Sequence, residues 1–212
     1  MKYKNILWDW NGTLMDDVSV ALDAVNIMLT RRGLKQINME QYYDYIDTPI
    51  IRFYEKCFDM TVDSETTLLP EFQREYASLS HMLPVDTSTY DTVCRLHTLG
   101  IRQFIVSSSH ERILRDWIKK YGIDGFIDGV TGAADLTAGS KVYRAQCLMK
   151  EYELDKESTV FIGDTLHDFE TATALGIDCI LVTYGHQSPT ENKKTGCVTA
   201  DGLNEILELF EE

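Results

Sequence analysis

Short apolar runs alternate with longer amphipathic segments along most of the chain. The apolar runs predict buried strands over residues 4–8, 103–107, 126–131, 159–163 and 179–183. Apolar residues at three- and four-residue spacing predict helices over residues 86–99, 110–121, 140–152, 165–175 and from 201 onward. Runs that are apolar throughout suit strands buried on both faces. The pattern therefore predicts an α/β fold, a doubly wound parallel sheet with helices on both faces.

Residues 15–83 interrupt this alternation, because they carry helical patterns and no strand pattern. Helices are expected over residues 17–32, from 38, over 50–58 and over 64–80. Asp17 is the expected N-cap of the first helix and Gly33 its stop. Pro70 is expected to end or restart the last helix, since proline removes a helical hydrogen bond. We therefore expect a helical insertion at 15–83 in a core made of residues 1–14 and 84–212.

Composition limits the classes of partner. A chain of 212 residues fits one domain with a modest insertion, and its 44% hydrophobic and 25% charged residues are ordinary for a globular protein. The 34 acidic residues exceed the 20 basic ones, so the net charge is −14. A negative surface disfavours nucleic acid and anionic membrane. It also repels phosphorylated substrates, so an anion site has to be built locally from a metal ion and a few cations.

The cysteines and the N-terminus indicate a cytoplasmic protein. The five cysteines form no C-x-x-C pair and are interpreted as reduced, mostly buried thiols. Asp9 interrupts the first apolar run too early for a signal peptide. No stretch approaches the roughly 18 consecutive apolar residues of a membrane span.

Polar residues follow three of the predicted strands, and a lysine opens one predicted helix. Asp9-Trp10-Asn11-Gly12-Thr13-Leu14 follows the first strand, and Ser107-Ser108 ends the second. Lys141 comes after a Gly-Ser pair, and Gly163-Asp164 ends a later strand with Asp168 four residues on. Ligands bind beyond the carboxyl ends of the strands in open α/β sheets. Each segment alone also has a structural interpretation, as a turn or as a helix cap.

Taken in this order, the four segments resemble the four motifs of the haloacid dehalogenase superfamily. The helical insertion and the chain length are most similar to its phosphoglycolate phosphatase and β-phosphoglucomutase branch. The resemblance implies a Rossmann-like core of five strands with the Asp9 strand in the centre and an α-helical cap at residues 15–83. It also implies a phosphoric monoester hydrolase that acts on a small phosphorylated metabolite, with Asp9 forming an aspartyl-phosphate.

Three carboxylates indicate a metal site. Asp164 and Asp168 are four residues apart at the start of a helix and share one face. Together with Asp9 they would repel one another unless a cation joined them, and Mg²⁺ prefers such oxygen ligands. The resemblance implies that Asp9, the backbone carbonyl of Asn11 and Asp164 bind the ion, with Asp168 close behind through water.

The remaining motif residues are expected to hold the phosphoryl group. Ser107 and Lys141 are the candidate catalytic and substrate-binding groups, because a hydroxyl and an ammonium stabilise phosphoryl oxygens. The resemblance adds Gly12, Thr13 and the backbone N–H of Ser108. We expect Trp10 to lie on the rim of the site.

Asn11 is a departure from the resembled pattern, which usually has Asp there as the general acid and base. Asn cannot transfer a proton, and acid–base catalysis contributes about 10²–10⁴ in rate. The favoured interpretation is a slow or specialised phosphatase. A phosphonate-cleaving hydrolase is the second, although such enzymes need a cap lysine and the insertion contains only Lys35 and Lys56. The third is a protein that binds a phosphorylated metabolite without turnover. The substrate is left open, as is the choice between monomer and homodimer.

Overall fold

A computed structural model describes residues 2–81, 83–133 and 140–211. Gly139, the first residue of the Gly-Ser pair before Lys141, lies outside these residues.

Six parallel strands form one sheet in the described part of the chain, in the order β3-β2-β1-β4-β5-β6. They are β1 (Asn5–Trp8), β2 (Arg102–His110), β3 (Gly129–Ala133), β4 (Thr159–Gly163), β5 (Asp178–Val182) and β6 (Val198–Ala200). Leu7 of β1 lies opposite Phe104 on one side and Phe161 on the other. Asp9 therefore follows a central strand, at the point where the strand order switches sides and ligands bind in such sheets.

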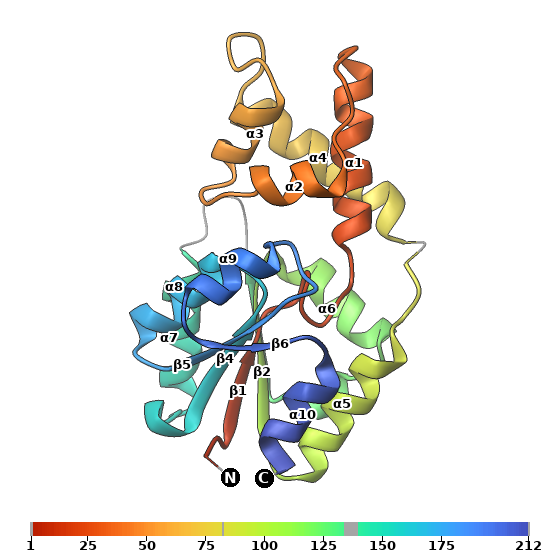
Figure 1. The fold of residues 1–212 in the computed structure, drawn as a ribbon. Helices are drawn as coiled ribbons and strands as arrows, with labels where there is room; N and C mark the ends of the chain where they lie inside the picture. Colours follow the sequence, from red (N-terminus) through yellow and green to blue (C-terminus); the bar gives the residue numbers. More distant parts are fainter. Residues whose placement is uncertain (1, 82, 134–139, 212) are drawn as a thin grey trace.

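Helices cover both faces of the sheet, as the sequence predicted (Figure 1). One face packs on α5 (Thr87–Thr98), α6 (Glu111–Lys120) and α10 (Leu203–Glu211), and the other on α7 (Lys141–Glu151) and α8 (Leu166–Leu175). Successive strand residues alternate between the two cores, so Ile6 and Trp8 enter the first while Leu7 enters the second. Both cores are apolar, which explains why β1 and β4 are buried along their whole length.

Four helices gather beyond the carboxyl ends of the strands, at the end of the molecule opposite both termini (Figure 1). These cap helices are α1 (Val18–Arg31), α2 (Met39–Tyr45), α3 (Ile51–Cys57) and α4 (Glu65–Ser80). They enclose an apolar core of their own, which includes Met28, Tyr54 and Leu68. The exact boundaries of the insertion, 15 and 83, stay a prediction.

The prediction that Pro70 interrupts the fourth cap helix is wrong, because α4 continues through it. Buried contacts on either side hold the helix together. Leu68 is fully buried, and Arg32 binds Glu71 through Nη2 at 2.7 Å. These tertiary contacts compensate for the one backbone hydrogen bond that proline removes.

The sequence pattern also missed elements near the C-terminus. The expected five-stranded sheet is wrong, because β6 adds a sixth strand beside β5. β6 is short and at the sheet edge, where Val198 is exposed, so it has no apolar run to reveal it. The polar helix α9 (Pro189–Lys194) was missed for a similar reason. The third strand begins at Gly129, because residues Asp124–Phe126 form a 3₁₀ turn.

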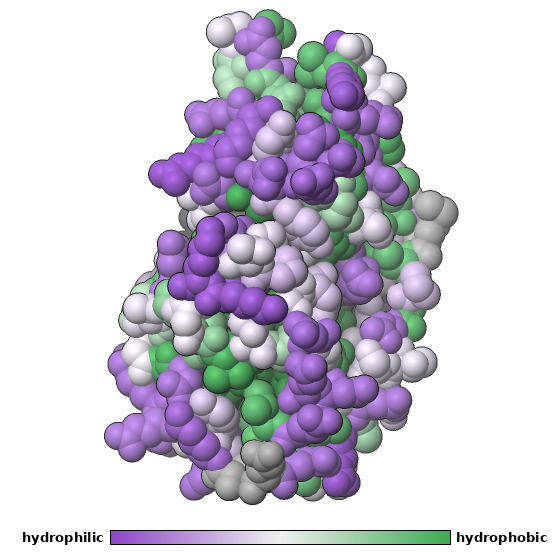
Figure 2. Space-filling view, in the orientation of Figure 1, coloured by the Kyte–Doolittle hydropathy of each residue, from purple (hydrophilic) through white to green (hydrophobic). Residues whose placement is uncertain are grey.

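Hydrophilic side chains cover much of the face shown in Figure 2, including most of the visible surface of the cap helices. This agrees with the excess of acidic residues in the chain. Among the described residues, no helix combines the length and the apolar character needed to cross a bilayer.

Candidate active site

The turn after β1 places the Asp9 carboxylate at the edge of the sheet. The Trp10 carbonyl accepts hydrogen bonds from the N–H groups of Thr13, Leu14 and Met15, which closes the turn tightly. Gly12 has a φ of +73°, and a Cβ there would lie 2.2 Å from Asp164 Oδ2. Only glycine fits this conformation and this approach. The Asn-Gly pair thus brings the first motif against the fourth.

The fourth motif fixes Asp168 through a capping box at the start of α8. Asp168 Oδ2 accepts hydrogen bonds from the backbone N–H groups of Asp164 at 3.1 Å and Thr165 at 3.0 Å, and from Thr165 Oγ1 at 2.8 Å. A Cβ on Gly163 would lie 2.4 Å from Asp168 Cγ, so glycine is required there too. Asp168 is therefore held rigidly, with Oδ1 directed to the site.

Lys141 joins the third motif to this cluster from the first turn of α7. Its buried Nζ donates to Asp9 and, at 2.6 Å, to Asp168 Oδ1. The four charged residues that the sequence predicted, Asp9, Lys141, Asp164 and Asp168, therefore come together, although they derive from three separate motifs.

Negative charge exceeds positive charge in this cluster. Asp9, Asp164 and Asp168 are all buried, and each offers an oxygen within 4.8 Å of the others. Burial raises the pKa of Asp9 to about 6 despite Lys141, and raises the pKa of Asp164 to about 8. Burial also opposes ionisation of Asp168, but Lys141 and Thr165 hold its pKa below the usual value. The positive charge of one lysine therefore does not balance three carboxylates, and the charges of Asp9 and Asp164 stay poorly compensated.

The donor set fits a hard divalent cation such as Mg²⁺, which binds carboxylate and carbonyl oxygens. Asp9 and Asp164 supply carboxylates, and no described residue donates a hydrogen bond to the carbonyl oxygen of Asn11. Both oxygens of Asp168 accept protein hydrogen bonds. Asp164 also accepts on both oxygens, from the Thr13 hydroxyl and from the His186 N–H. That Asp168 acts from behind the other ligands stays a prediction.

The second motif brings hydroxyl groups to the same edge of the sheet. Ser107 is fully buried and its Oγ accepts from the Ser109 N–H at 3.0 Å, whereas Ser108 is exposed. Arg144 donates from Nη2 to the Ser107 carbonyl at 3.1 Å, which connects α7 to β2. Thr13 is buried, and its Oγ1 lies 3.4 Å from Asp164 Oδ1.

A second acidic group, Asp17, lies next to Asn11. Asp17 stands at the predicted N-cap position of the first helix, but its side chain makes no capping hydrogen bond to α1. Instead, Asp17 Oδ2 accepts from Asn11 Nδ2 at 2.8 Å and from the Tyr76 hydroxyl at 2.5 Å. Asp17 Oδ1 accepts from the Gly12 N–H at 2.8 Å and lies 3.3 Å from His186 Nε2.

His186 completes this arrangement from the loop after β5. Its backbone N–H donates to Asp164 Oδ2 at 2.6 Å, and its ring nitrogen Nδ1 lies 2.9 Å from the Tyr42 hydroxyl. Burial lowers the pKa of His186, but Tyr42 and Asp17 raise it more, so that it ends well above the usual value. Burial disfavours the charged form of Asp17 as well, yet His186 and the hydroxyl and amide donors hold its pKa below the usual range.

Sequence reasoning missed Asp17, Ser109, Tyr42, Tyr76 and His186 as parts of the site. The tyrosines lie on cap helices and His186 on a loop far along the chain, and no local spacing connects them. The expectation for Trp10 was wrong, because it is 1% exposed and packs edge-on against Tyr121 in the core.

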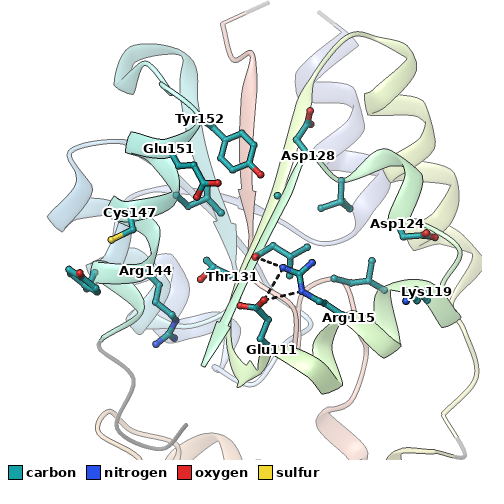
Figure 3. A pocket seen from close by; sticks show the side chains of 16 residues that line it. Glu111, Arg115, Lys119, Asp124, Asp128, Thr131, Arg144, Cys147, Glu151 and Tyr152 are labelled. Atoms are coloured by element: carbon teal, nitrogen blue, oxygen red, sulfur yellow. Dashed lines mark hydrogen bonds and ion pairs between the residues drawn. The ribbon is translucent and has the colours of Figure 1, made fainter. Parts of the chain in front are cut away.

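A separate cavity of about 610 Å³ lies at the outer edge of the sheet, between α6 and α7 (Figure 3). Arg115 and Glu111 form an ion pair on its wall, and Asp128 and Tyr152 line it further along. None of Asp9, Asp164 and Asp168 lines this cavity. The candidate active site is therefore the buried charged cluster, which lies apart from this cavity.

Comparison with known proteins identifies the family of the chain. The family model described as "Haloacid dehalogenase-like hydrolase" matches residues 6–182, which include all four motifs. The chain belongs to this family. A phosphoglycolate phosphatase from Vibrio parahaemolyticus is 25% identical to the chain, covering 97% of it and 95% of the relative. A 5'-nucleotidase from Pseudomonas aeruginosa is 24% identical, covering 98% and 97%.

The solved structures show the same fold. A haloacid dehalogenase-like family hydrolase from Streptococcus pneumoniae superposes with a TM-score of 0.81 at 19% identity, covering 98% of each chain. The family and fold predicted from the four motifs are thus confirmed, and the protein is a haloacid dehalogenase-like hydrolase.

Proposed function

We propose that this hydrolase is a Mg²⁺-dependent phosphatase that removes the phosphoryl group from a small metabolite, as a phosphoglycolate phosphatase does. The observation that carries the proposal is the buried cluster in which Asp9 contacts Lys141 and adjoins Asp164 and Asp168. The names of the relatives support a phosphorylated substrate, since they are phosphatases and a nucleotidase.

In this proposal Asp9 is the nucleophile that accepts the phosphoryl group and later releases it to water. Lys141 holds Asp9 ionised and in place, and stabilises the negative charge of the phosphoryl oxygens. Ser107, the Ser108 N–H, Gly12 and Thr13 surround these oxygens. The metal ion, bound by Asp9, Asp164 and the Asn11 carbonyl with Asp168 behind, supplies electrostatic stabilisation of the transferred group.

Asn11 limits the range of leaving groups. Its carboxamide has no proton to give to a departing alkoxide, so substrates with good leaving groups should be hydrolysed faster than alkyl phosphates. Because the surface is acidic, the negative charge of the substrate has to be balanced by cations within the site itself.

The phosphonate interpretation needs a cap lysine directed to the substrate. Lys56 instead donates to the Tyr45 carbonyl at 3.1 Å and lies 3.5 Å from Asp47. Lys35 is exposed beyond the end of α1. Neither lysine contacts the Asp9 cluster, so we do not propose phosphonate cleavage.

The test is a panel of phosphorylated metabolites, including phosphoglycolate and nucleoside monophosphates, assayed with Mg²⁺ and with a chelator. We expect metal-dependent phosphate release from at least one member, and no release by Asp9→Asn. The matched control is Asp91→Asn, which removes an exposed carboxylate from α5 and should not change the rate. Activity in Asp9→Asn, or no activity on any phosphate ester in the wild type, would contradict the proposal.

A further inference from the structure

We propose that Asn11 and Asp17 are a complementary pair, in which Asp17 is the positioning residue that holds the cap helices on the core. The carboxylate of Asp17 is the point where side chains from both parts meet. In this view Asn11 is an amide because Asp17 requires a donor beside it. The inference deepens the proposed function, but the contact itself does not depend on which reaction the site performs.

The surroundings of Asp17 consist of donors. Asn11 Nδ2 and the Tyr76 hydroxyl share Oδ2, while the Gly12 N–H and His186 Nε2 face Oδ1. Asp17 is 1% exposed, so water does not supply these hydrogen bonds. Only a carboxylate accepts on both oxygens without presenting a donor of its own.

The surroundings of Asn11 likewise match an amide, with a donor facing its oxygen and acceptors facing its nitrogen. Its Oδ1 accepts from Ser109 Oγ at 2.6 Å, and its Nδ2 donates to Asp17 and to the Tyr76 hydroxyl at 3.0 Å. A carboxylate at position 11 would place one of its oxygens against Asp17 Oδ2, at a separation where a hydrogen bond now exists. Two ionised carboxylates in buried contact repel strongly.

These contacts connect the two parts of the molecule. Tyr76 comes from α4 and Tyr42 from α2. On the core side, Ser109 lies in β2, and Asn11 and His186 follow β1 and β5. Tyr76 reaches Asp17 directly, and Tyr42 reaches it through His186. Asp17 lies in the chain segment that leaves the core for the cap helices, so it anchors the cap helices where this segment enters α1.

Exchange of the two residues gives a sharp test. In the double variant Asn11→Asp/Asp17→Asn, the new carboxylate at position 11 accepts from Ser109, from Tyr76 and from the new amide at position 17. The oxygen of that new amide accepts from the Gly12 N–H and from His186. Every donor in the wild-type arrangement therefore keeps an acceptor, whereas each single variant leaves an unmatched pair.

Hydrogen exchange measured by mass spectrometry on the metal-free full-length chain tests the Asn11–Asp17 contact without an assay of enzymatic activity. We expect Asn11→Asp and Asp17→Asn each to speed exchange in α4 around Tyr76 by about tenfold or more, because a buried polar group loses its partner. The double variant should return to within about twofold of wild type. The matched control, Asp16→Asn, removes a neighbouring exposed carboxylate and should leave exchange unchanged.

Tyr76→Phe guards against a single variant that does not fold, since it keeps both Asn11 and Asp17 and removes only one hydroxyl. It should speed exchange in the same segment, though less than Asp17→Asn does. Wild-type exchange in Tyr76→Phe, or a double variant as fast as the faster single, would overturn the proposal. Either result would leave the phosphatase proposal standing, because that is judged by the Asp9→Asn assay.

Discussion

The buried Asp9 cluster and the buried Asp17 carboxylate both adjoin Gly12, and they are compensated in different ways. Lys141 contacts Asp9 and Asp168, whereas Asp164 accepts from the His186 N–H and the Thr13 hydroxyl. Asp17, by contrast, is a single carboxylate with a donor at every side and a histidine beside it. Both groups are almost inaccessible to solvent.

The difference shows which group needs a ligand. Burial of an ionised carboxylate is costly unless hydrogen bonds or opposite charge offset it. The Asp17 group meets this condition with protein atoms alone and is therefore structural. The Asp9 group does not, as the raised pKa values of Asp9 and Asp164 indicate, and a divalent cation would complete it.

The largest effect expected from this comparison is loss of metal binding in Asp164→Ala. The variant removes one of the two poorly compensated carboxylates, so the remaining oxygens no longer suffice to hold Mg²⁺. Isothermal calorimetry should show no Mg²⁺ binding while circular dichroism shows a folded protein. Unchanged affinity would mean that the ion binds elsewhere.

An intermediate effect is expected when the exchanged pair is assayed for hydrolysis. Asn11→Asp/Asp17→Asn supplies a carboxyl group at the acid–base position without repulsion, so alkyl phosphate hydrolysis should rise by about 10²-fold. Asn11→Asp alone should rise less, because Asp17 opposes the new charge. Aryl phosphates, whose leaving groups need little protonation, should change little in either variant.

Equal rates for the single and double variants on alkyl phosphates would show that Asp17 does not oppose a carboxylate at position 11. Peptide mass spectrometry is the necessary control, since Asn11-Gly12 is a sequence that deamidates. A deamidated fraction of wild type would otherwise imitate the single variant.

The smallest effect concerns the pH dependence of stability. An acid whose pKa is raised by folding holds its proton more tightly when folded, so the metal-free protein should lose stability as pH rises from about 4 to about 8. His186 acts in the same direction, because its raised pKa stabilises the fold only until pH passes that value. Mg²⁺ should remove the part that Asp9 and Asp164 contribute.

Urea denaturation at pH 5, 7 and 9, with and without Mg²⁺, measures this effect. The stabilisation by Mg²⁺ should increase with pH beyond pH 7, and the increase should be smaller in Asp164→Asn. A Mg²⁺ effect that is independent of pH between 7 and 9 would show that Asp164 is already ionised in the metal-free protein.

Three of the four motifs could be found from the sequence because each lies within a few residues of a strand end, whereas Lys141 opens a predicted helix. A parallel sheet brings such ends to one edge, so Asp9, Ser107 and Asp164 had to lie near one another once the strands were identified. Local pattern failed where the element was short or polar, as in β6 and α9, or where tertiary contacts overruled a residue preference, as at Pro70.

The sequence by itself determined the family, the parallel sheet and the charged residues of the site, because strand periodicity, glycine turns and acidic spacing are local properties. Only the tertiary structure decided the role of Asp17, which local reasoning assigned to a helix cap. Its partners are far apart in the chain. Tyr76 comes 65 residues after Asn11, and His186 is farther still from Tyr76. Whether a buried carboxylate needs a metal ion or is already satisfied depends on such distant donors, and these meet only when the chain folds.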